Sequence, residues 1–452
     1  MGRPPLTSFS VVARCPDGHP LVIRNHPLDH RSEPFPTLFW LTCPEAVKRV
    51  SRLEAEGWIK RHAERAEQDP VFGEALTRAH AQHARERARY VPGAEAWGGV
   101  TGSPGGVKCL HAHYANHLAG GEDPVGAWVA ERVEPVHRAV TGRVAAVDMG
   151  TNSIRLLVAD PDDGADLREV GRDMVITRIG QGVDERGALD ADALDRTTDV
   201  LGWYARRARA LGAERIRVGA TSAVRDASNR EDLFRRVGEL TGADPEVLSG
   251  EREAGLSFLG ATRGLDAPAP SLVFDIGGGS TELVLGTERP EAAISVDVGS
   301  VRIMERVAPS DLPSEEDLRA MRTLAAEALS PAADAVPPGR AATLVGVAGT
   351  TTTVQALALG LERYDPEAIH RTVLSRSDAE RITGDLAQMT TAQRAALPVM
   401  APGRADVIVA GCLILLEILE RWGFEECLVS ERDILDGLAL EMLTETGAGG
   451  YP

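Results

Sequence analysis

FDIGGGSTELVL at Phe274–Leu285 and VDMGTNSIRLLV at Val147–Val158 are two copies of one sequence pattern. Each copy has an apolar run that ends in Asp, a tight loop of small or hydroxyl-bearing residues, and a second apolar run that leads away. A loop of this kind between two strands exposes backbone N–H groups that can hold phosphate oxygens. The repeat therefore predicts a duplicated half-domain whose two phosphate loops face each other across a cleft.

Composition and charge narrow the class of protein. The 452 residues, 43% of them hydrophobic, can build two or three domains. The formal net charge of −18 argues against nucleic-acid binding, because nucleic-acid-binding proteins usually carry a basic surface. Five cysteines and no charged-then-apolar leader are typical of the cytoplasm. The longest apolar run, Val407–Leu416, is too short to span a membrane.

The order of the expected elements indicates three segments. We expect a small α+β domain over 1–138, with polar helices over 44–57 and 70–90, and then an α/β core in two halves over 142–266 and 267–447. The elements expected in the core are strands Arg143–Asp148, Ile154–Asp160, Arg215–Ala220, Leu272–Asp275, Glu282–Leu285, Ile294–Val298 and Leu344–Ala348, and a helix over Asp190–Leu211.

The two loops supply phosphate donors and metal ligands. Main-chain N–H groups can surround a phosphoryl group, and Asp275 and Glu282 beside the second loop suit Mg²⁺, with Mn²⁺ as the alternative ion. The alternative for each loop is an ordinary turn between strands. The predicted phosphate-binding residues of the loops are Gly150, Thr151, Asn152 and Ser153 in the first, and Gly277, Gly278, Gly279, Ser280 and Thr281 in the second.

Two arginines and a further turn are also predicted to contact phosphate. Arg155 aligns with Glu282, so one wall of the cleft can grip phosphate while the other holds metal. Arg225 opens a helix after an apolar strand, where anions are favoured; the alternative is an ion pair with Asp226 or Glu231. The strand-to-helix turn at Gly349 and Thr350 can contact a distal phosphate or a nucleotide.

A candidate general base lies in Ser249–Ala254, which reads SGEREA. This segment opens a helix on which Glu253, Ser257 and Gly260 share one polar, small-residue stripe. On a helix that lines the cleft, Glu253 can take a proton from the attacking water. The alternative is that it only complements the helix dipole.

The N-terminal segment is rich in metal-binding residue types. Cys109, His113 and His117 have a spacing of four residues, which would place them on one helix face and would suit Zn²⁺. The alternative is buried structural cysteines and solvated histidines, because no Cys-x-x-Cys pair is present. The candidate ligands are Cys15, Cys43, Cys109, His111, His113 and His117.

The run from about 143 to 440 resembles the exopolyphosphatase and guanosine pentaphosphate phosphohydrolase family. The N-terminal segment resembles an uncharacterised actinobacterial domain through Pro34–Pro44 and Val107–His111. The stretches that carry the family resemblance of the core are Val144–Val158, Ala220–Ala227, Ser249–Ala254, Val273–Leu285, Val347–Thr353 and Arg404–Gly411.

The resemblance implies an actin-like, ribonuclease-H-like core that releases orthophosphate from polyphosphate or from the 5′-triphosphate of a guanosine alarmone. It implies that Glu253, not Glu251, is the base, and that Asp148, Asp275 and Glu282 order metal and water. It implies phosphate contacts for the two loops, Arg155 and Arg225.

The sequence departs from the family at two places. Glu431–Gly437 replaces an Arg-Glu-Gly turn, and the chain stops about where the core ends, which favours short polyphosphates or pppGpp-like substrates.

We therefore expect a Mg²⁺-dependent exopolyphosphatase that forms a homodimer. One alternative is a pppGpp 5′-phosphohydrolase, which would need a guanosine pocket that no sequence feature identifies. The other is an actin-like nucleotide-binding sensor without hydrolase activity, since the same fold binds ATP. The N-terminal domain is expected to regulate or dock the core.

Overall fold

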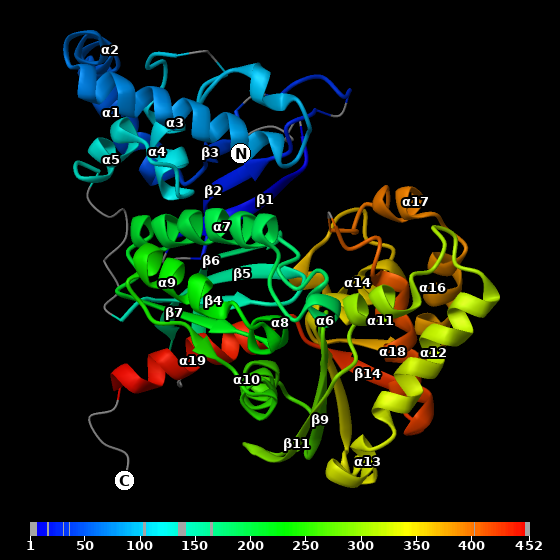
Figure 1. Ribbon diagram of the computed structural model, residues 1–452. Helices are drawn as coiled ribbons and strands as arrows, with labels where there is room; N and C mark the ends of the chain where they lie inside the picture. The colour runs from blue at the N-terminus through cyan, green and yellow to red at the C-terminus, as the bar shows by residue number, and fades with distance from the viewer. Residues whose placement is uncertain are drawn as a thin grey trace.

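The chain folds into an N-terminal α+β domain and two α/β halves, each built around its own sheet (Figure 1). A computed structural model describes residues 7–15, 18–29, 31–35, 37–102, 105–133, 142–162, 166–401 and 403–447. The expected duplicated α/β core with an additional α+β domain is confirmed. The boundary predicted after residue 138 lies in 134–141, outside the described residues.

The N-terminal domain packs helices on one small antiparallel sheet, in the order β1-β2-β3. The predicted polar helices correspond to α1 and α3. Its core is formed by apolar residues of the sheet and the helices, such as Val22, Phe39, Val50 and Leu110. The elements are β1 Phe9–Arg14, β2 Pro20–Asn25, β3 Phe39–Leu41, α1 Pro44–Ala55, α2 Trp58–Gln68, α3 Pro70–Ala88, the 3-10 helix Ala94–Trp97, α4 Leu110–Leu118 and α5 Pro124–Ala130.

The first half of the core has a mixed sheet in the order β6-β5-β4-β7-β8. The strands β4, β5 and β6 are antiparallel neighbours, whereas β7 and β8 run parallel to β4, as in a ribonuclease-H-like domain. The long strand β6 was not expected from the sequence. The elements are β4 Val144–Met149, β5 Ser153–Asp162, β6 Asp166–Ile176, α6 Val183–Arg186, α7 Ala191–Ala210, β7 Arg215–Ala220, α8 Ser222–Asp226, α9 Arg230–Thr241, β8 Glu246–Val247 and α10 Gly250–Thr262.

The second half repeats this strand order as β11-β10-β9-β12-β14, with β13 added antiparallel at the edge. Its helices pack around β9, where Leu272, Phe274 and Ile276 enter one core. The elements are β9 Ser271–Ile276, β10 Thr281–Gly286, β11 Pro290–Val296, α11 Ser300–Val307, α12 Glu315–Leu329, α13 Ala332–Ala335, the 3-10 helix Pro338–Arg340, β12 Thr343–Val347, α14 Ala348–Ala358, α15 Pro366–Ile369, β13 Thr372–Ser375, α16 Arg376–Ala387, α17 Thr391–Ala395, α18 Ile408–Arg421, β14 Glu426–Val429 and α19 Ile434–Gly447.

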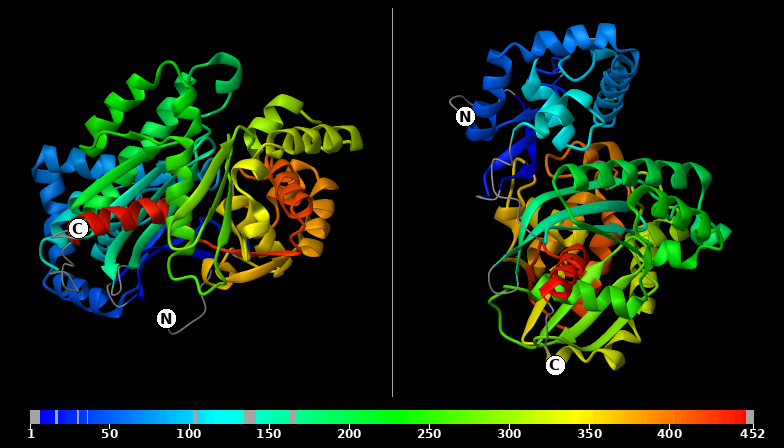
Figure 2. Two further views of the ribbon diagram at one scale, coloured as in Figure 1. Left: turned by 90° about the horizontal axis from the view of Figure 1, so that it is seen from below. Right: turned by 90° about the vertical axis from the view of Figure 1, so that its left-hand side faces the viewer.

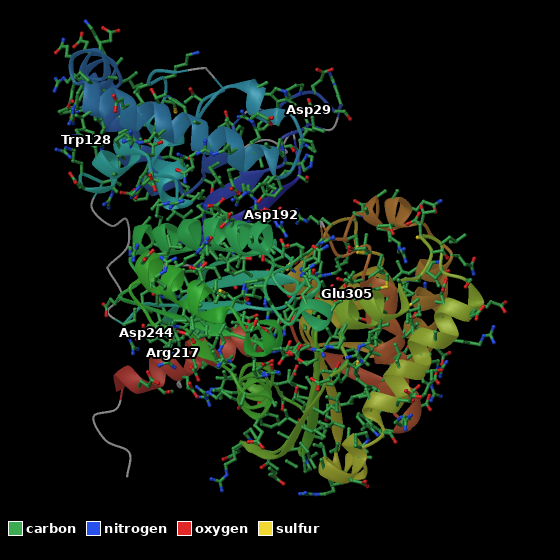
Figure 3. All side chains as sticks on the ribbon, in the orientation of Figure 1. Asp29, Trp128, Asp192, Arg217, Asp244 and Glu305 are labelled. Atoms are coloured by element: carbon green, nitrogen blue, oxygen red, sulfur yellow. The ribbon has the colours of Figure 1, made fainter. Side chains whose placement is uncertain are left out.

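The last helix, α19, leaves the second half and returns to the first, where it lies against β4, β5 and α10 (Figure 2). Leu438 joins a core with Val144, Ala146 and Leu157 of the first sheet. Arg217 of β7 holds the outer end of α19 through Glu445, at 2.7 Å (Figure 3). The C-terminal helix is therefore part of the first half.

The N-terminal domain is joined to the first half by buried polar contacts. Arg207 of α7 has no exposed surface, donates to Asp173 of β6 at 2.7 Å, and also donates to the backbone oxygen of Val12 in β1. Arg24 of β2 pairs with the same Asp173 at 3.2 Å. Removal of one partner from a buried charge pair is strongly destabilising, so these contacts hold the N-terminal domain on α7.

Among the described residues, no helix combines the length and the hydrophobicity that crossing a bilayer requires.

Candidate active site

The two predicted phosphate loops are the turns β4–β5 and β9–β10, and they have the same backbone geometry. The N–H of Gly150 donates to the oxygen of Ser153 at 2.9 Å, and the N–H of Gly277 donates to the oxygen of Ser280 at 3.0 Å. Loop carbonyl oxygens accept from the segment that follows each hairpin, for example Asn152 from Arg178. The repeated sequence pattern thus produces a repeated turn.

The loops face each other and touch. An added Cβ at Gly278 would lie 3.1 Å from Cβ of Thr151, and one at Gly279 would lie 2.5 Å from Oγ of Ser222. Thr151 Oγ1 is 3.0 Å from Ser222 Oγ, which extends the contact surface to α8. A side chain at Gly279 would collide with Ser222, so glycine permits this close approach of the second loop to the first half. The facing arrangement predicted from the repeat is present.

The cleft between the halves is closed at the loop contact in this structure. The hollow at the loops, bounded by residues that include Thr151, Gly279 and Glu305, measures about 10 Å³, which is no more than a single water needs. Bonds across the cleft hold it shut: Glu305 of α11 accepts from the N–H of Gly182 at 2.8 Å (Figure 3), and Arg178 pairs with Asp406 at 2.7 Å. A phosphate group can enter this hollow only if the halves move apart.

Four buried carboxylates lie behind the loops, on β4, α10, β9 and β10. Asp148, Glu253, Asp275 and Glu282 are each at most 7% exposed. Asp275 and Glu282 are opposite each other in the β9–β10 register, and in the first half the same positions hold Asp148 and Arg155. The aligned sequences therefore correspond to aligned positions in the two sheets.

Burial and mutual repulsion disfavour the charged form of these carboxylates. Burial, and then the charge of Glu282, raises the pKa of Glu253 to about 9 and that of Asp275 to about 7. Burial also raises the pKa of Asp148 and of Glu282. Serine hydroxyls compensate in part, because Ser257 donates to Asp275 at 2.8 Å and Ser295 to Glu282 at 2.7 Å.

The oxygen ligands of the acidic group suit a divalent cation in kind, although not in their present arrangement. Oδ1 of Asp148 is buried and has no hydrogen-bond partner, and hard carboxylate oxygens are the ligands that Mg²⁺ and Mn²⁺ prefer. In this closed form, however, Asp148, Asp275 and Glu282 do not converge on one point. Within the described parts of the chain, the one group of three possible ligand atoms mutually within 4.8 Å lies in the N-terminal domain.

The two predicted phosphate-binding arginines are paired with carboxylates. Arg155 donates to Asp148 at 2.7 and 3.0 Å and also to Asp433, which precedes α19. Arg225 donates to Oε1 of Glu253 at 2.6 Å and to the backbone oxygen of Leu248 at 2.8 Å. The ion pair of Arg225 with Asp226 is looser, at 3.9 Å. Both arginines therefore reach the acidic group.

A third turn, at the start of α14, lies against Arg404, to which the sequence analysis assigned no role. Gly349 lies against the guanidinium of Arg404, which donates to Oγ1 of Thr353 at 2.7 Å. Burial lowers the pKa of Arg404, and the nearby charge of Arg155 adds to the lowering. Ala348 has a φ of 62°, a strained value for a residue with a side chain. The sequence signal for Arg404 is its place at the start of Arg404–Gly411, one of the stretches that carry the family resemblance, although no role was assigned to it there.

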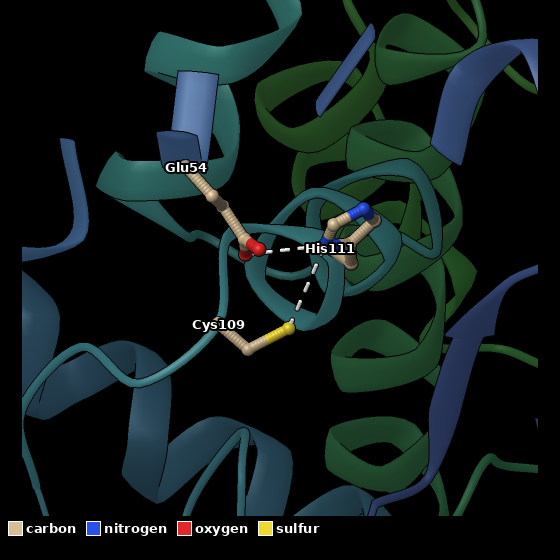
Figure 4. Close-up of side chains that lie close together, drawn as sticks. All are labelled: Glu54, Cys109 and His111. Atoms are coloured by element: carbon tan, nitrogen blue, oxygen red, sulfur yellow. Dashed lines mark hydrogen bonds and ion pairs between the residues drawn. The ribbon is translucent and has the colours of Figure 1, made fainter. Parts of the chain in front are cut away.

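In the N-terminal domain, the expected Cys-His stripe on one helix is wrong. Helix α4 begins at Leu110, and Cys109 precedes it with an extended φ of −157°. His113 is buried and bonds to Asp123 at 2.8 Å. Cys109 and His111 instead lie with Glu54, which the sequence analysis had not named (Figure 4).

The chain is similar to known proteins over both of its parts. Residues 157–446 match the Ppx/GppA phosphatase family, and residues 11–131 match the protein family of unknown function DUF501. Exopolyphosphatase 2 of Mycobacterium tuberculosis is 45% identical over 313 residues, which cover 66% of this chain and 98% of that protein. Exopolyphosphatase 1 of Mycobacterium leprae is 29% identical over 312 residues, or 68% of this chain and 91% of that protein.

Solved structures agree with these matches. The crystal structure of an exopolyphosphatase-like protein superimposes with a TM-score of 0.64 at 36% identity, over 67% of this chain and 99% of that one. The Ppx/GppA family member of Aquifex aeolicus gives a TM-score of 0.59 at 30% identity, over 68% and 99%. The chain therefore belongs to the Ppx/GppA phosphatase family, and it is a phosphatase that carries a DUF501 domain before its catalytic core.

Proposed function

We propose that this phosphatase is an exopolyphosphatase, which releases terminal orthophosphate from inorganic polyphosphate. The observation that carries the proposal is the contact between two like phosphate loops, one from each half, with four buried carboxylates behind them. The relatives that are named exopolyphosphatases support the choice of substrate.

In the proposed complex the halves separate enough to admit one terminal phosphoryl group. Amides of Gly150–Ser153 and Gly277–Thr281 donate to its oxygens, as backbone donors do in other phosphate cradles. Arg155 and Arg225 exchange carboxylate partners for phosphate oxygens, a planar contact that guanidinium groups make well. Gly349 and Thr350, with Arg404 beside them, contact the next phosphate.

Glu253 is the proposed general base. It lies in the first turn of α10, where burial raises its pKa to about 9 while the charge of Arg225 favours the ionised carboxylate, as a bound cation also would. Its carboxylate takes a proton from water as the water oxygen forms the new bond to phosphorus. The bond to the bridging oxygen breaks, and the shortened polyphosphate leaves with that oxygen.

Mg²⁺ is the proposed cofactor, with Mn²⁺ as the alternative, and Asp148, Asp275 and Glu282 would hold it. When bound, the ion neutralises charge on the phosphate oxygens. The buried oxygen of Asp148 without a partner and the raised pKa values of the group support this assignment.

Short chains are the proposed substrates. The net charge of −18 on the whole chain repels a polyanion, and the repulsion grows with the length of polyphosphate that extends beyond the loops. Added salt would screen this repulsion, so KM for long chains should fall with salt more than KM for short ones.

The proposal is tested by measuring phosphate release by the full-length protein from polyphosphates of several lengths and from guanosine pentaphosphate. Each substrate is assayed with Mg²⁺, with Mn²⁺ and with chelator. We expect metal-dependent release, fastest from short polyphosphates. Faster release from guanosine pentaphosphate would favour the alarmone phosphohydrolase, and ATP binding without release from any substrate would favour the sensor.

A further inference from the structure

Three side chains of the N-terminal domain converge at the contact between α1 and α4 (Figure 4). Glu54 lies near the end of α1, Cys109 immediately precedes α4, and His111 lies in its first turn. Nδ1 of His111 is 3.1 Å from Oε1 of Glu54 and 3.8 Å from Sγ of Cys109. One ligand atom from each residue lies within 4.8 Å of the other two.

The orientation of the His111 ring is fixed from its other side. Nε2 is 3.1 Å from the backbone oxygen of Val47 and 3.2 Å from Oγ of Ser51. A carbonyl oxygen can only accept, so Nε2 carries a hydrogen and Nδ1 turns toward the carboxylate and the thiol. A histidine that binds metal through one ring nitrogen usually donates from the other to a carbonyl or carboxylate.

The carboxylate of Glu54 is also held in place. Its Oε1 accepts from the backbone N–H of Leu110 at 2.7 Å, which fixes it over the start of α4. Both His111 and Glu54 are thus oriented by bonds that a bound ion would leave intact.

We propose that Glu54, Cys109 and His111 bind a divalent transition-metal ion, for which Zn²⁺ is the best match. Usual Zn–ligand lengths in a tetrahedral site put sulfur and nitrogen roughly 3.6 Å apart, and nitrogen and oxygen roughly 3.4 Å apart. The distances of 3.8 and 3.1 Å are close to these edges. Mg²⁺ and Ca²⁺ do not suit a thiolate and an imidazole.

Water completes the proposed coordination. The side chains of His111 and Glu54 are 21% and 24% exposed, so the open side of the group faces solvent. The site would join α1 to α4, independently of the Mg²⁺ proposed for the core.

Protonation is the rival to metal binding. Without a metal, His111 can carry a second proton and pair with Glu54, and the Cys109 side chain, followed by Val47 and Glu54, raises the pKa of His111 to about 9. Metal content and spectroscopy separate the two states, because a proton gives no absorption band.

The test uses the full-length protein, freed of metal by chelator and titrated with Co²⁺, followed by competition with Zn²⁺. We expect one equivalent of Co²⁺ to give a near-ultraviolet thiolate-to-metal charge-transfer band that Zn²⁺ abolishes, whereas any Co²⁺ held by the carboxylates of the core gives no such band. Cys109→Ser should remove the band, and Glu54→Gln and His111→Gln should each weaken binding at least about 10-fold.

Cys15→Ser is the matched control. Cys15 also has a histidine neighbour, with Sγ 4.0 Å from Nδ1 of His19, but it is not part of the three-residue group. This variant should keep the band and the affinity of the wild type. Circular dichroism checks that each variant is folded.

Two results would overturn the proposal: wild-type protein that gives no stoichiometric thiolate-to-metal band with Co²⁺, or folded Glu54→Gln and His111→Gln variants that give the band with the affinity of the wild type. The wild-type titration decides even if Cys109→Ser does not fold.

Discussion

Arg225 donates to Oε1 of Glu253 at 2.6 Å, across the space between α8 and the first turn of α10. This contact joins the proposed base to a proposed phosphate ligand. When Arg225 turns to a phosphate oxygen, Glu253 loses the positive charge that favours its ionised form, and the pKa of Glu253 rises further unless a bound cation takes the place of Arg225. Substrate arrival and the protonation state of the proposed base are therefore coupled in the proposed mechanism.

Glu253→Gln should reduce kcat by ~10²–10⁴-fold, because the amide cannot take a proton from water. Glu251→Gln is the matched control, since Glu251 is exposed on the same helical turn and should leave kcat unchanged. Phosphate release under saturating substrate measures both. An active Glu253→Gln enzyme would refute the base assignment.

Gly279→Ala should lower kcat/KM by about 10²-fold, because the new methyl group would meet Ser222 Oγ at 2.5 Å and displace one phosphate loop from the other. In Gly238→Ala, the control, the added carbon has no neighbour within 4 Å. Unchanged kinetics in Gly279→Ala would show that the loops need not approach each other during turnover.

Acidification should destabilise the N-terminal domain through His62. Burial lowers the pKa of His62 to about 4; its ring stacks on Phe72 and meets Trp128 edge-on. Between pH 6.5 and 4 the unfolded chain binds more protons at this residue than the folded one. The free energy of unfolding should therefore decrease as the pH is lowered from 6.5 to 4, by at most about 1.4 kcal/mol per pH unit.

Tryptophan fluorescence during urea unfolding measures this effect. His62→Phe should flatten the dependence of the urea midpoint on pH, whereas a His26→Gln control, at an exposed position, should leave it as in the wild type. Equal slopes in the wild type and His62→Phe would contradict the prediction.

Arg207→Met should destabilise the protein by ~3–5 kcal/mol, since it removes one member of a buried charge network and leaves Asp173 with fewer partners. The free energy of unfolding in urea measures the loss. Arg235→Met removes an arginine of α9 whose side chain is 57% exposed and forms ion pairs at the surface. This variant should change stability little. A similarly small change in Arg207→Met would mean that this network does not hold the N-terminal domain on α7.

The sequence was sufficient to predict the paired loops, because a tight turn and its flanking strands are local features. The register that sets Glu282 opposite Asp275 follows directly from the hairpin. The second carboxylate partner of Arg155, Asp433, could not be predicted, since Asp433 reaches Arg155 only when α19 returns to the first half. The closed cleft likewise depends on contacts between distant segments.

The proposed metal ligands of the N-terminal domain could likewise be predicted only in part. Periodicity placed Cys109 on a helix, but α4 starts one residue later, and a shift of one residue removed it from the expected face. Glu54 comes from a different helix, which no pattern within the chain connects to His111.

The return of α19 to the first half means that the chain passes between the halves twice, once between α10 and β9 and once between β14 and α19. Two covalent links between the halves constrain their relative motion more than one link does. Opening should then be a rotation about the line that joins the links, with sliding and twisting suppressed. Such a hinge would bring Thr151 and Gly279 back to the same contact after each turnover.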